Sequence, residues 1–562
     1  MFCRLAAAHR AIASRSGTIT VIANMGASMK NMRFAARLMG IAALCAPVWA
    51  VAQTSYTPQA QLCANGSGTL CPVIPAIIGP DPSLDLPDYP GLFRQLPTAP
   101  GNDVETPFDN MAWQMFVALN WATNASDLSP PAGLTAPRPR LWQSYRKVSA
   151  LFGDSKARAS CPNPQGLPVF NIGSNGQGQP SPNNEEYFQA STNLPLIDIN
   201  GNWTIYERRV NDIEANYLLS PNGQTADTLT TVAGQQAFIA DKTNQPDGVQ
   251  FTASALVPNG ANGSIEIKAA WRIIDRAAGD DPSRYYTENA LLAVSGDLVR
   301  GGRQICSSVT LGLVGLHIIQ RNPANQHPEL KPRWIWATFE HVDNAPMAQS
   351  PCNVGDKDGC GTNSWLNQAS CGAASPAKQM RYSYFKQNAG IAGTNIAPQG
   401  LLQRDADKSE HPLQVKYPWN PRPPYARDAT SKATAMPQAT RCWNIYPTTQ
   451  QLNTQWQQAL KKQNSVLQNY MLVGTQWGAS LNPRLETKLP KDAVPAMLSN
   501  ITLETYIQNY TGSDPNLPGP GSCIGCHNFA TLPADNTTSA NFSFLPGLAQ
   551  PETARSRIKT PR

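Results

Sequence analysis

Apolar side chains recur at helical spacing early in the chain. The stripe consists of Phe108, Met111, Met115 and Leu119, which lie three or four positions apart. This spacing places side chains on one face of an α-helix. Thr106 suits the N-cap position, and Pro107 suits the first helical position. The pattern predicts a helix over residues 107–120 whose apolar face joins the core.

A second helical pattern lies near the C-terminus. Its apolar positions are Leu452, Trp456, Leu460, Leu467 and Met471. Gly474 follows them, and glycine commonly ends a helix. The pattern predicts a helix over residues 450–473, with Met471 on the apolar stripe.

Four stretches between these helices are rich in residues that favour β-strands. They span residues 203–208, 264–274, 309–319 and 333–342. The third is apolar at nearly every position, which is typical of a central strand covered on both faces. The fourth alternates, with Ile335, Ala337, Phe339 and His341 on one face. Residues 321–333 are predicted to form a hairpin loop, so the sheet should be mostly antiparallel.

These elements predict an α+β protein with two regions. Residues 53–429 should form a large, loop-rich region built on the antiparallel sheet. Residues 430–562 should form a mainly helical region. The boundary is placed at residues 411–425, which contain five prolines and resemble a linker.

The N-terminus has the pattern of a secretory signal peptide. A basic stretch from Met29 precedes the apolar residues 38–51, and Ala50-Val51-Ala52 forms a small-residue cleavage site. Residues 1–28 add nothing to this signal, and starts at Met25, Met29 or Met32 would all keep it. The pattern predicts that residues 1–52 are removed and that the mature chain is periplasmic or secreted. No later stretch reaches about 18 apolar residues, so no transmembrane segment is expected in the mature chain.

The charge balance changes once this leader is set aside. The 562 residues carry 45 basic and 38 acidic side chains, but six basic and no acidic ones fall in residues 1–52. The remainder is close to neutral, which excludes a strongly basic nucleic-acid-binding surface as the default interpretation.

Cysteine usage fits an oxidising compartment. Outside the leader and the motif described below, the cysteines are Cys63, Cys71, Cys161, Cys306, Cys352, Cys360, Cys371 and Cys442. Eight such residues predict up to four disulfides, while buried free thiols are the alternative. One bridge is expected between Cys63 and Cys71, and one within the set Cys352, Cys360 and Cys371.

The sequence that carries chemistry is Cys523-Ile524-Gly525-Cys526-His527. In the spacing C-x-x-C-H, two thiols can bond covalently to one porphyrin, while the adjacent imidazole binds the iron. A zinc site would need a second pair of ligands at a similar spacing. A thioredoxin-like motif should follow a strand, whereas this one follows Pro518-Gly519-Pro520-Gly521. The motif therefore predicts one covalently bound haem c.

Residues 500–550 resemble the c-type cytochromes through this motif. The resemblance implies that Cys523 and Cys526 attach the haem and that His527 is the proximal iron ligand. The whole mature chain looks like large secreted bacterial proteins described as cytochrome c family proteins. That broader resemblance is carried by residues 113–121, residues 313–317 and Phe544-Leu545. It implies haem binding and electron transfer.

The distal ligand is less obvious, because the 35 residues after His527 contain neither Met nor His. Met497, in a proline-flanked segment, is the first candidate, and Met471 is expected to pack in the core. The histidine alternatives are His317 and His341 in apolar strands, and His327 and His411 in loops. Core packing is the default interpretation of His317 and His341.

Two functions remain open at this point. The first is an exported monohaem electron carrier that works with a redox partner protein. The second is a periplasmic haem enzyme of peroxidase or oxidase type, with an open iron position and a substrate pocket in residues 53–429. A third interpretation treats that region as a binding module with a haem region attached. The basic C-terminal tail could bind an acidic partner or simply be solvated; its charges are Arg555, Arg557, Lys559 and Arg562.

Overall fold

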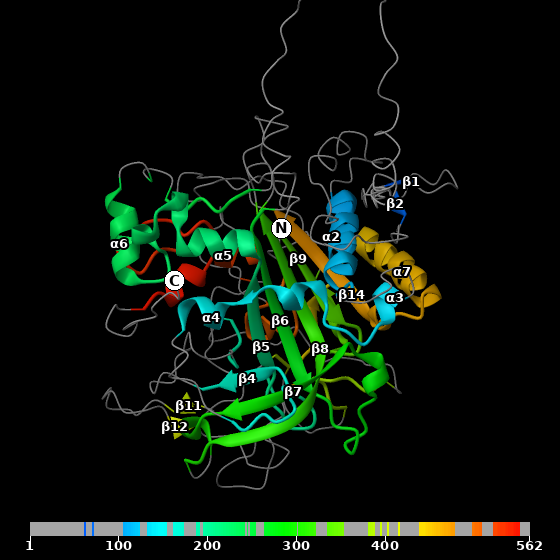
Figure 1. The fold of residues 1–562 in the computed structure, drawn as a ribbon. Helices are drawn as coiled ribbons and strands as arrows, with labels where there is room; N and C mark the ends of the chain where they lie inside the picture. The colour runs from blue at the N-terminus through cyan, green and yellow to red at the C-terminus, as the bar shows by residue number, and fades with distance from the viewer. Residues whose placement is uncertain are drawn as a thin grey trace, which may run out of the picture. The chain divides into compact units, whose positions relative to one another are not determined.

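A curled sheet of eight strands organises the fold in this computed structural model (Figure 1). The strand order is β14-β9-β8-β6-β5-β3, and β7 pairs with both β8 and β4. All neighbours are antiparallel except β4 and β7. The strands are β3 (Arg146–Lys147), β4 (Val169–Ile172), β5 (Ile205–Val210), β6 (Ile265–Ile273), β7 (Thr287–Val294), β8 (Ile305–Arg321), β9 (Trp334–His341) and β14 (Tyr470–Trp477).

Helices and small strand pairs complete the architecture. The helices are α2 (Glu105–Leu119), α3 (Ala132–Thr135), α4 (Val148–Phe152), α5 (Asp212–Leu219), α6 (Val232–Ala240), α7 (Pro447–Lys462) and α8 (Cys523–His527). The pairs are β1 (Gln61–Leu62) with β2 (Leu70–Cys71), β10 (Met347–Cys352) with β13 (Arg441–Trp443), and β11 (Leu402–Gln403) with β12 (Gln414–Val415). The structure describes residues 61–62, 70–71, 105–123, 132–153, 161–173, 187–190, 195–241, 244, 248–253, 263–299, 302–321, 334–352, 380–387, 394–395, 402–403, 414–415, 438–477, 497–508 and 521–550.

The α+β class and the mostly antiparallel sheet are confirmed. Each of the four predicted strands corresponds to an observed one: β5, β6, β8 and β9. Strand β8 is buried without interruption from Leu311 to Arg321, as expected for a central strand covered on both faces. Its first half pairs with β7 and its second half lies between β6 and β9. The predicted loop 321–333 lies almost wholly outside the described residues.

Helices α2 and α7 cover one face of the sheet. The indole of Trp113 on α2 stacks on Trp456 of α7 at 5.8 Å and meets Phe339 of β9 edge-on at 5.0 Å. Both indoles also donate hydrogen bonds to the opposite helix, Trp113 to Asn453 and Trp456 to Asn110, each at 2.9 Å. The predicted helix 107–120 is therefore confirmed, and its burial is completed by a partner from the other end of the chain.

The helix predicted over residues 450–473 is wrong in its second half. Helix α7 ends at Lys462, and Asn464 has a left-handed φ of 54° that breaks the helical path. The chain then forms strand β14, which carries Met471. Gly474 is a strand residue beside a register shift after Leu472, so it relieves a bulge and does not cap a helix.

The opposite face of the sheet is covered by the C-terminal segment. Because successive strand residues point to opposite faces, Ile319 and Trp336 face away from the α2–α7 layer. They belong to a buried cluster with Ile524, Phe542 and Leu545. Helices α5 and α6 contribute to the same cluster, and Figure 1 shows them beside the red C-terminal part of the chain. Because Ile524 belongs to this cluster, the sequence motif packs against the sheet.

The C-terminal region is built differently from the mainly helical region that the sequence predicts. Its described part contains α7, β13, β14 and the single-turn α8, with irregular segments between them. Strand β14 is hydrogen-bonded to β9, so this region completes the main sheet. Residues Thr54–Arg562 form one compact unit. Most of the predicted boundary at 411–425 lies outside the described residues.

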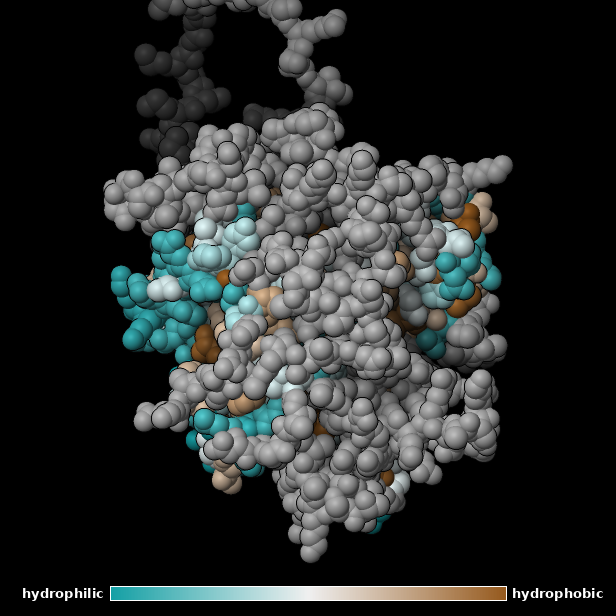
Figure 2. Space-filling view, turned by 180° about the vertical axis from the view of Figure 1, so that it is seen from behind, coloured by the Kyte–Doolittle hydropathy of each residue, from teal (hydrophilic) through white to brown (hydrophobic). Residues whose placement is uncertain are grey.

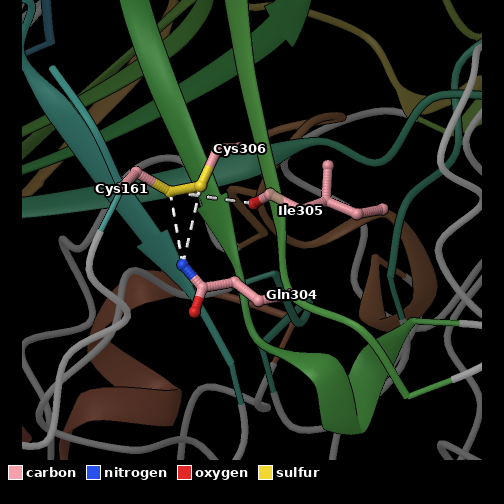
Figure 3. The surroundings of a disulfide bond; sticks show 4 residues. All are labelled: Cys161, Gln304, Ile305 and Cys306. Atoms are coloured by element: carbon pink, nitrogen blue, oxygen red, sulfur yellow. Dashed lines mark hydrogen bonds between the residues drawn. A yellow bond between two sulfur atoms is a disulfide. The ribbon is translucent and has the colours of Figure 1, made fainter. Parts of the chain in front are cut away.

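A disulfide joins two distant segments of the sheet region. Cys161 and Cys306 are bonded, although they lie 145 positions apart in sequence (Figure 3). This pair was not among the expected ones. Cys352 and Cys442 are also disulfide-bonded. The bridge expected within the set Cys352, Cys360 and Cys371 stays a prediction. Cys63, Cys360 and Cys371 lie outside the described residues.

Part of the surface of the described residues is visible from behind. Most of the described surface seen from behind is hydrophilic, and apolar residues form small separate patches there (Figure 2). In the described part of the chain, no helix combines the length and the apolar character needed to cross a bilayer.

Candidate functional site

The motif cysteines lie on one turn of helix. Ser522 is the N-cap of α8, because its hydroxyl accepts a hydrogen bond from the Gly525 amide at 3.1 Å. The Cys526 amide donates to the Ser522 carbonyl at 3.0 Å and closes the turn. Cys523 and Cys526, three residues apart, therefore point to the same side of this turn. The sheet also holds the helix, since the Ile524 amide donates to Gln476 Oε1 of β14 at 3.3 Å.

Both motif cysteines are reduced thiols that take part in no disulfide. Burial raises the pKa of the Cys523 thiol, so this group stays protonated at neutral pH. Its Sγ lies 3.8 Å from the Leu498 carbonyl.

One ring nitrogen of His527 is hydrogen-bonded to a backbone carbonyl. Its Nδ1 lies 2.6 Å from the Phe542 carbonyl. A carbonyl can only accept, so Nδ1 carries the hydrogen and Nε2 carries the lone pair. Burial lowers the pKa of His527 to about 4, which keeps the imidazole neutral and able to bind a metal. The rings of Phe544 and Trp336 lie 5.0 and 5.7 Å from the imidazole.

A cavity of about 310 Å³ borders the motif. Small-molecule sites commonly begin at about this size. Its lining includes Arg208, Lys268, His317, Glu504, Cys526 and His527. The first three form a cross-strand row, because Arg208 pairs with Lys268 and Lys268 pairs with His317. The sheet therefore presents basic side chains to the space beside the motif.

Glu504 is bound to His317 inside this cavity. The distance from His317 Nε2 to Glu504 Oε1 is 2.9 Å, and the other carboxylate oxygen accepts the Asn500 amide at 2.9 Å. Burial alone would raise the pKa of Glu504, but His317 and the hydrogen bonds lower it overall. The carboxylate is therefore ionised and holds the imidazole in place.

Met497, the expected distal ligand, packs in a different environment. It is buried beside Cys352, Cys442 and Trp443. Its methyl group lies so close to Gly521 that a β-carbon there would come within 2.5 Å of it. The described lining of the cavity does not include Met497. Its assignment as an iron ligand stays a prediction.

The other candidate iron ligands lie in different environments. Met471 is half-buried on β14 and contacts a small apolar cluster. His341 has both ring nitrogens engaged, with the Arg284 carbonyl at 2.8 Å and the Asp343 amide at 3.1 Å. His327, His411 and the basic tail lie outside the described residues. His317 is the candidate that shares the cavity with His527.

The sequence motif identified three residues of this site but missed Lys268, Glu504 and the Phe542 carbonyl. One signal for Lys268 was present: it lies between Ile267 and Ala269 in a largely buried strand, and a charged residue in such a strand needs a special environment. His317 carries the same signal in β8. Nothing in the pattern around Glu504 or Phe542 indicated that either would meet a histidine.

No protein-family model, curated protein or solved structure matches this chain. Among the described residues, no group of three or more His, Cys, Asp or Glu side chains could hold a bare metal ion.

Proposed function

We propose that the chain is an exported, monohaem c-type cytochrome that transfers electrons. Cys523 and Cys526 would form the two thioether bonds to haem c, and His527 would bind the iron through Nε2. The leader 1–52 would deliver the chain to the periplasm or the exterior, where such haem attachment occurs in bacteria. The region 430–562 would hold the group.

The observation that carries this proposal is the arrangement around α8. Two reduced thiols lie on one helical turn, directly followed by a neutral imidazole whose Nδ1–H is bound to a carbonyl. Metal-binding histidines usually have their second nitrogen fixed in this way, which sets the tautomer and strengthens the ligand. The cavity that borders Cys526 and His527 provides space beside these groups. The residues therefore fit a haem c.

Bound haem would supply an iron that changes reversibly between the ferrous and ferric states. The chain itself contributes the orientation of His527, set by Phe542, and an apolar wall of Trp336 and Phe544. Phe544 is 43% exposed, so this wall reaches the surface. A redox partner protein could approach there, as the electron-transfer function requires.

A second candidate is a haem enzyme of peroxidase or oxidase type. The observation that favours it is the polar part of the cavity, where Arg208, Lys268 and the His317–Glu504 pair lie near the motif. Basic residues and a histidine–carboxylate pair could bind and protonate a small molecule at an open iron.

Covalent haem attachment is tested by expressing the full chain, leader included, in a bacterium competent in cytochrome c maturation. The denatured protein should keep peroxidase stain on a gel, and a pyridine haemochrome assay should give about one haem per chain. The stain should appear in the periplasmic fraction. C523S/C526S should remove it, whereas the matched pair C161S/C306S should retain it. An unstained wild-type band would overturn the proposal.

The two candidates are then separated by the spectrum of the ferric protein. A low-spin spectrum that cyanide changes slowly supports the electron carrier. A high-spin spectrum with rapid cyanide binding and reaction with peroxide supports the enzyme.

A further inference from the structure

We propose that His317 is the second axial ligand of the haem and that Glu504 positions it. This inference rests on the proposed function and deepens it, because it makes the iron six-coordinate. It arises from the cavity that β8 and the C-terminal motif share.

His317 lies on the same face of the sheet as the motif. Strand β8 alternates, so His317 and Ile319 point to one side, and Ile319 is paired with Trp336 of β9. The Trp336 ring centre is 5.7 Å from the His527 ring centre. The two imidazoles thus line one cavity from different walls, one supplied by the sheet and one by α8.

Glu504 prepares His317 for this role. Because the carboxylate can only accept, it takes the Nε2–H of His317 at 2.9 Å and leaves the lone pair on Nδ1. A carboxylate on the second nitrogen is the common arrangement for a metal-binding histidine, and it raises the basicity of the ligand.

The turn that carries Glu504 is itself fixed to the sheet. The Asn500 side-chain amide donates to Thr338 Oγ1 at 2.8 Å and to the Phe339 carbonyl at 2.9 Å. The Ile501 amide donates to Glu340 Oε1 at 2.7 Å. These contacts hold the Glu504 carboxylate in place before any metal binds. The side chains of Glu504 and His317 therefore lose little conformational freedom when the imidazole binds a metal.

The competing ligands have other partners. Met497 packs beside Trp443, and the methionine would have to leave that cluster to reach the cavity. His341 uses both ring nitrogens on backbone groups and stacks on Tyr285 at 4.1 Å. His317 has one nitrogen on a carboxylate and needs no such rearrangement.

The test compares H317A, E504Q and M497A as full-length, haem-loaded proteins. Haem stain and haemochrome stoichiometry are measured first, because they report attachment independently of the distal side. Ferric optical and electron paramagnetic resonance spectra and the reduction potential are then recorded. H317A should keep its haem, lose the low-spin signal and bind cyanide faster, and added imidazole should restore the low-spin spectrum. E504Q should stay low-spin with a raised potential, since the imidazole becomes a weaker donor.

M497A is the matched control and should keep the wild-type spectrum. H317M provides a second measurement if H317A is poorly folded by circular dichroism, since a thioether at this position should give the weak near-infrared Met–iron band and a raised potential. A low-spin spectrum retained in H317A, or lost in M497A, would overturn the assignment of His317. A high-spin wild-type protein would overturn it as well, while leaving covalent attachment intact. A wild-type chain without haem stain would overturn the proposed function and this inference together.

Discussion

The carbonyl of Phe542 lies 2.6 Å from Nδ1 of His527, fifteen residues earlier in the chain. Phe542 has a φ of 65° and Asn541 a φ of 53°, so two consecutive residues occupy the left-handed region. That region is costly for a residue with a β-carbon, and for a bulky one in particular. The turn holds this conformation because it is anchored: Asn541 Oδ1 accepts the Trp334 indole N–H at 2.6 Å. The sheet therefore aims the carbonyl that fixes the tautomer of the motif histidine.

Replacing Asn541 by Ala should destabilise the protein and disturb the motif. The buried Trp334 N–H would lose its acceptor, at a cost of about 1–3 kcal/mol, and the backbone would prefer to leave the left-handed region. Urea unfolding measures the loss, and the haem-loaded protein should show a raised reduction potential. Asn536→Ala is the control, because Asn536 is exposed and has a similar φ of 55°. Equal losses in the two variants would contradict the anchoring role of Trp334.

His341 should make the protein sensitive to acid. Burial lowers its pKa from 6.5 to about 4, so the folded state resists protonation of a ring that the unfolded chain protonates readily. Because the folded pKa is the lower one, stability is fully present above about pH 6.5 and is lost as the pH falls toward 4. The linkage relation gives a loss of about 2 kcal/mol between pH 7.5 and pH 5.

The measurement is the free energy of unfolding at these two pH values for wild type and His341→Gln. The variant should start lower at pH 7.5, since it loses the stacking on Tyr285 and Tyr470. Its further loss on acidification should be smaller than in the wild type by about 2 kcal/mol. Parallel pH profiles would show that His341 is not the residue responsible.

The Cys161–Cys306 disulfide should stabilise the sheet region substantially. It closes a long segment of chain, because its two cysteines lie 145 positions apart in sequence, and it restricts the unfolded state accordingly. Replacing both cysteines by Ser should cost about 2–5 kcal/mol in unfolding free energy. Reductant should lower the melting temperature of C161S/C306S less than that of the wild type. Equal melting temperatures for the two oxidised proteins would contradict this role.

The sequence allowed the local part of this structure to be predicted. Alternation in residues 334–341 identified β9 and its faces, and the stripe from Phe108 to Leu119 identified α2, because both patterns depend on neighbours in the chain. Strand β14 was missed because Leu467 and Met471 continue the helical spacing of α7, although Asn464 turns the backbone with its left-handed φ. Residues 470–477 form a strand because they pair with β9, which lies about 135 positions upstream. A pattern of neighbouring residues cannot indicate a partner at that distance.

The candidate site, too, could be predicted only where its residues are close together in the sequence. Cys523, Cys526 and His527 are adjacent, so their spacing was sufficient to predict a haem attachment motif. The contact between His317 and Glu504 joins residues 187 positions apart, and it exists only because the turn after Leu498 folds onto β8 and β9. The sequence could mark His317 as unusual in an apolar strand, but only the fold supplies its partner.

Gly315 should be essential for placing that turn. A β-carbon at this position would lie 2.1 Å from Thr502 Oγ1 and 3.1 Å from Asn500 Oδ1, so the turn and β8 approach too closely for any other residue. Thr502 and Asn500 are buried and hydrogen-bonded to each other, which prevents either from moving away easily. Gly315→Ala should therefore lower the free energy of unfolding by about 1–3 kcal/mol, as overpacking commonly does.

The same substitution should also weaken the contact between Glu504 and His317. His317 lies two residues after Gly315 in β8, and displacement of the turn would move Glu504 away from it. The haem-loaded variant should show a raised reduction potential in addition to its lower stability. Gly547→Ala is the matched control: Gly547 is exposed, and a β-carbon added there would meet nothing within 4 Å, so it should behave as wild type in both measurements. A Gly315→Ala protein with wild-type stability would show that the turn can move without cost. Reduced stability with an unchanged potential would show that Glu504 does not act through His317.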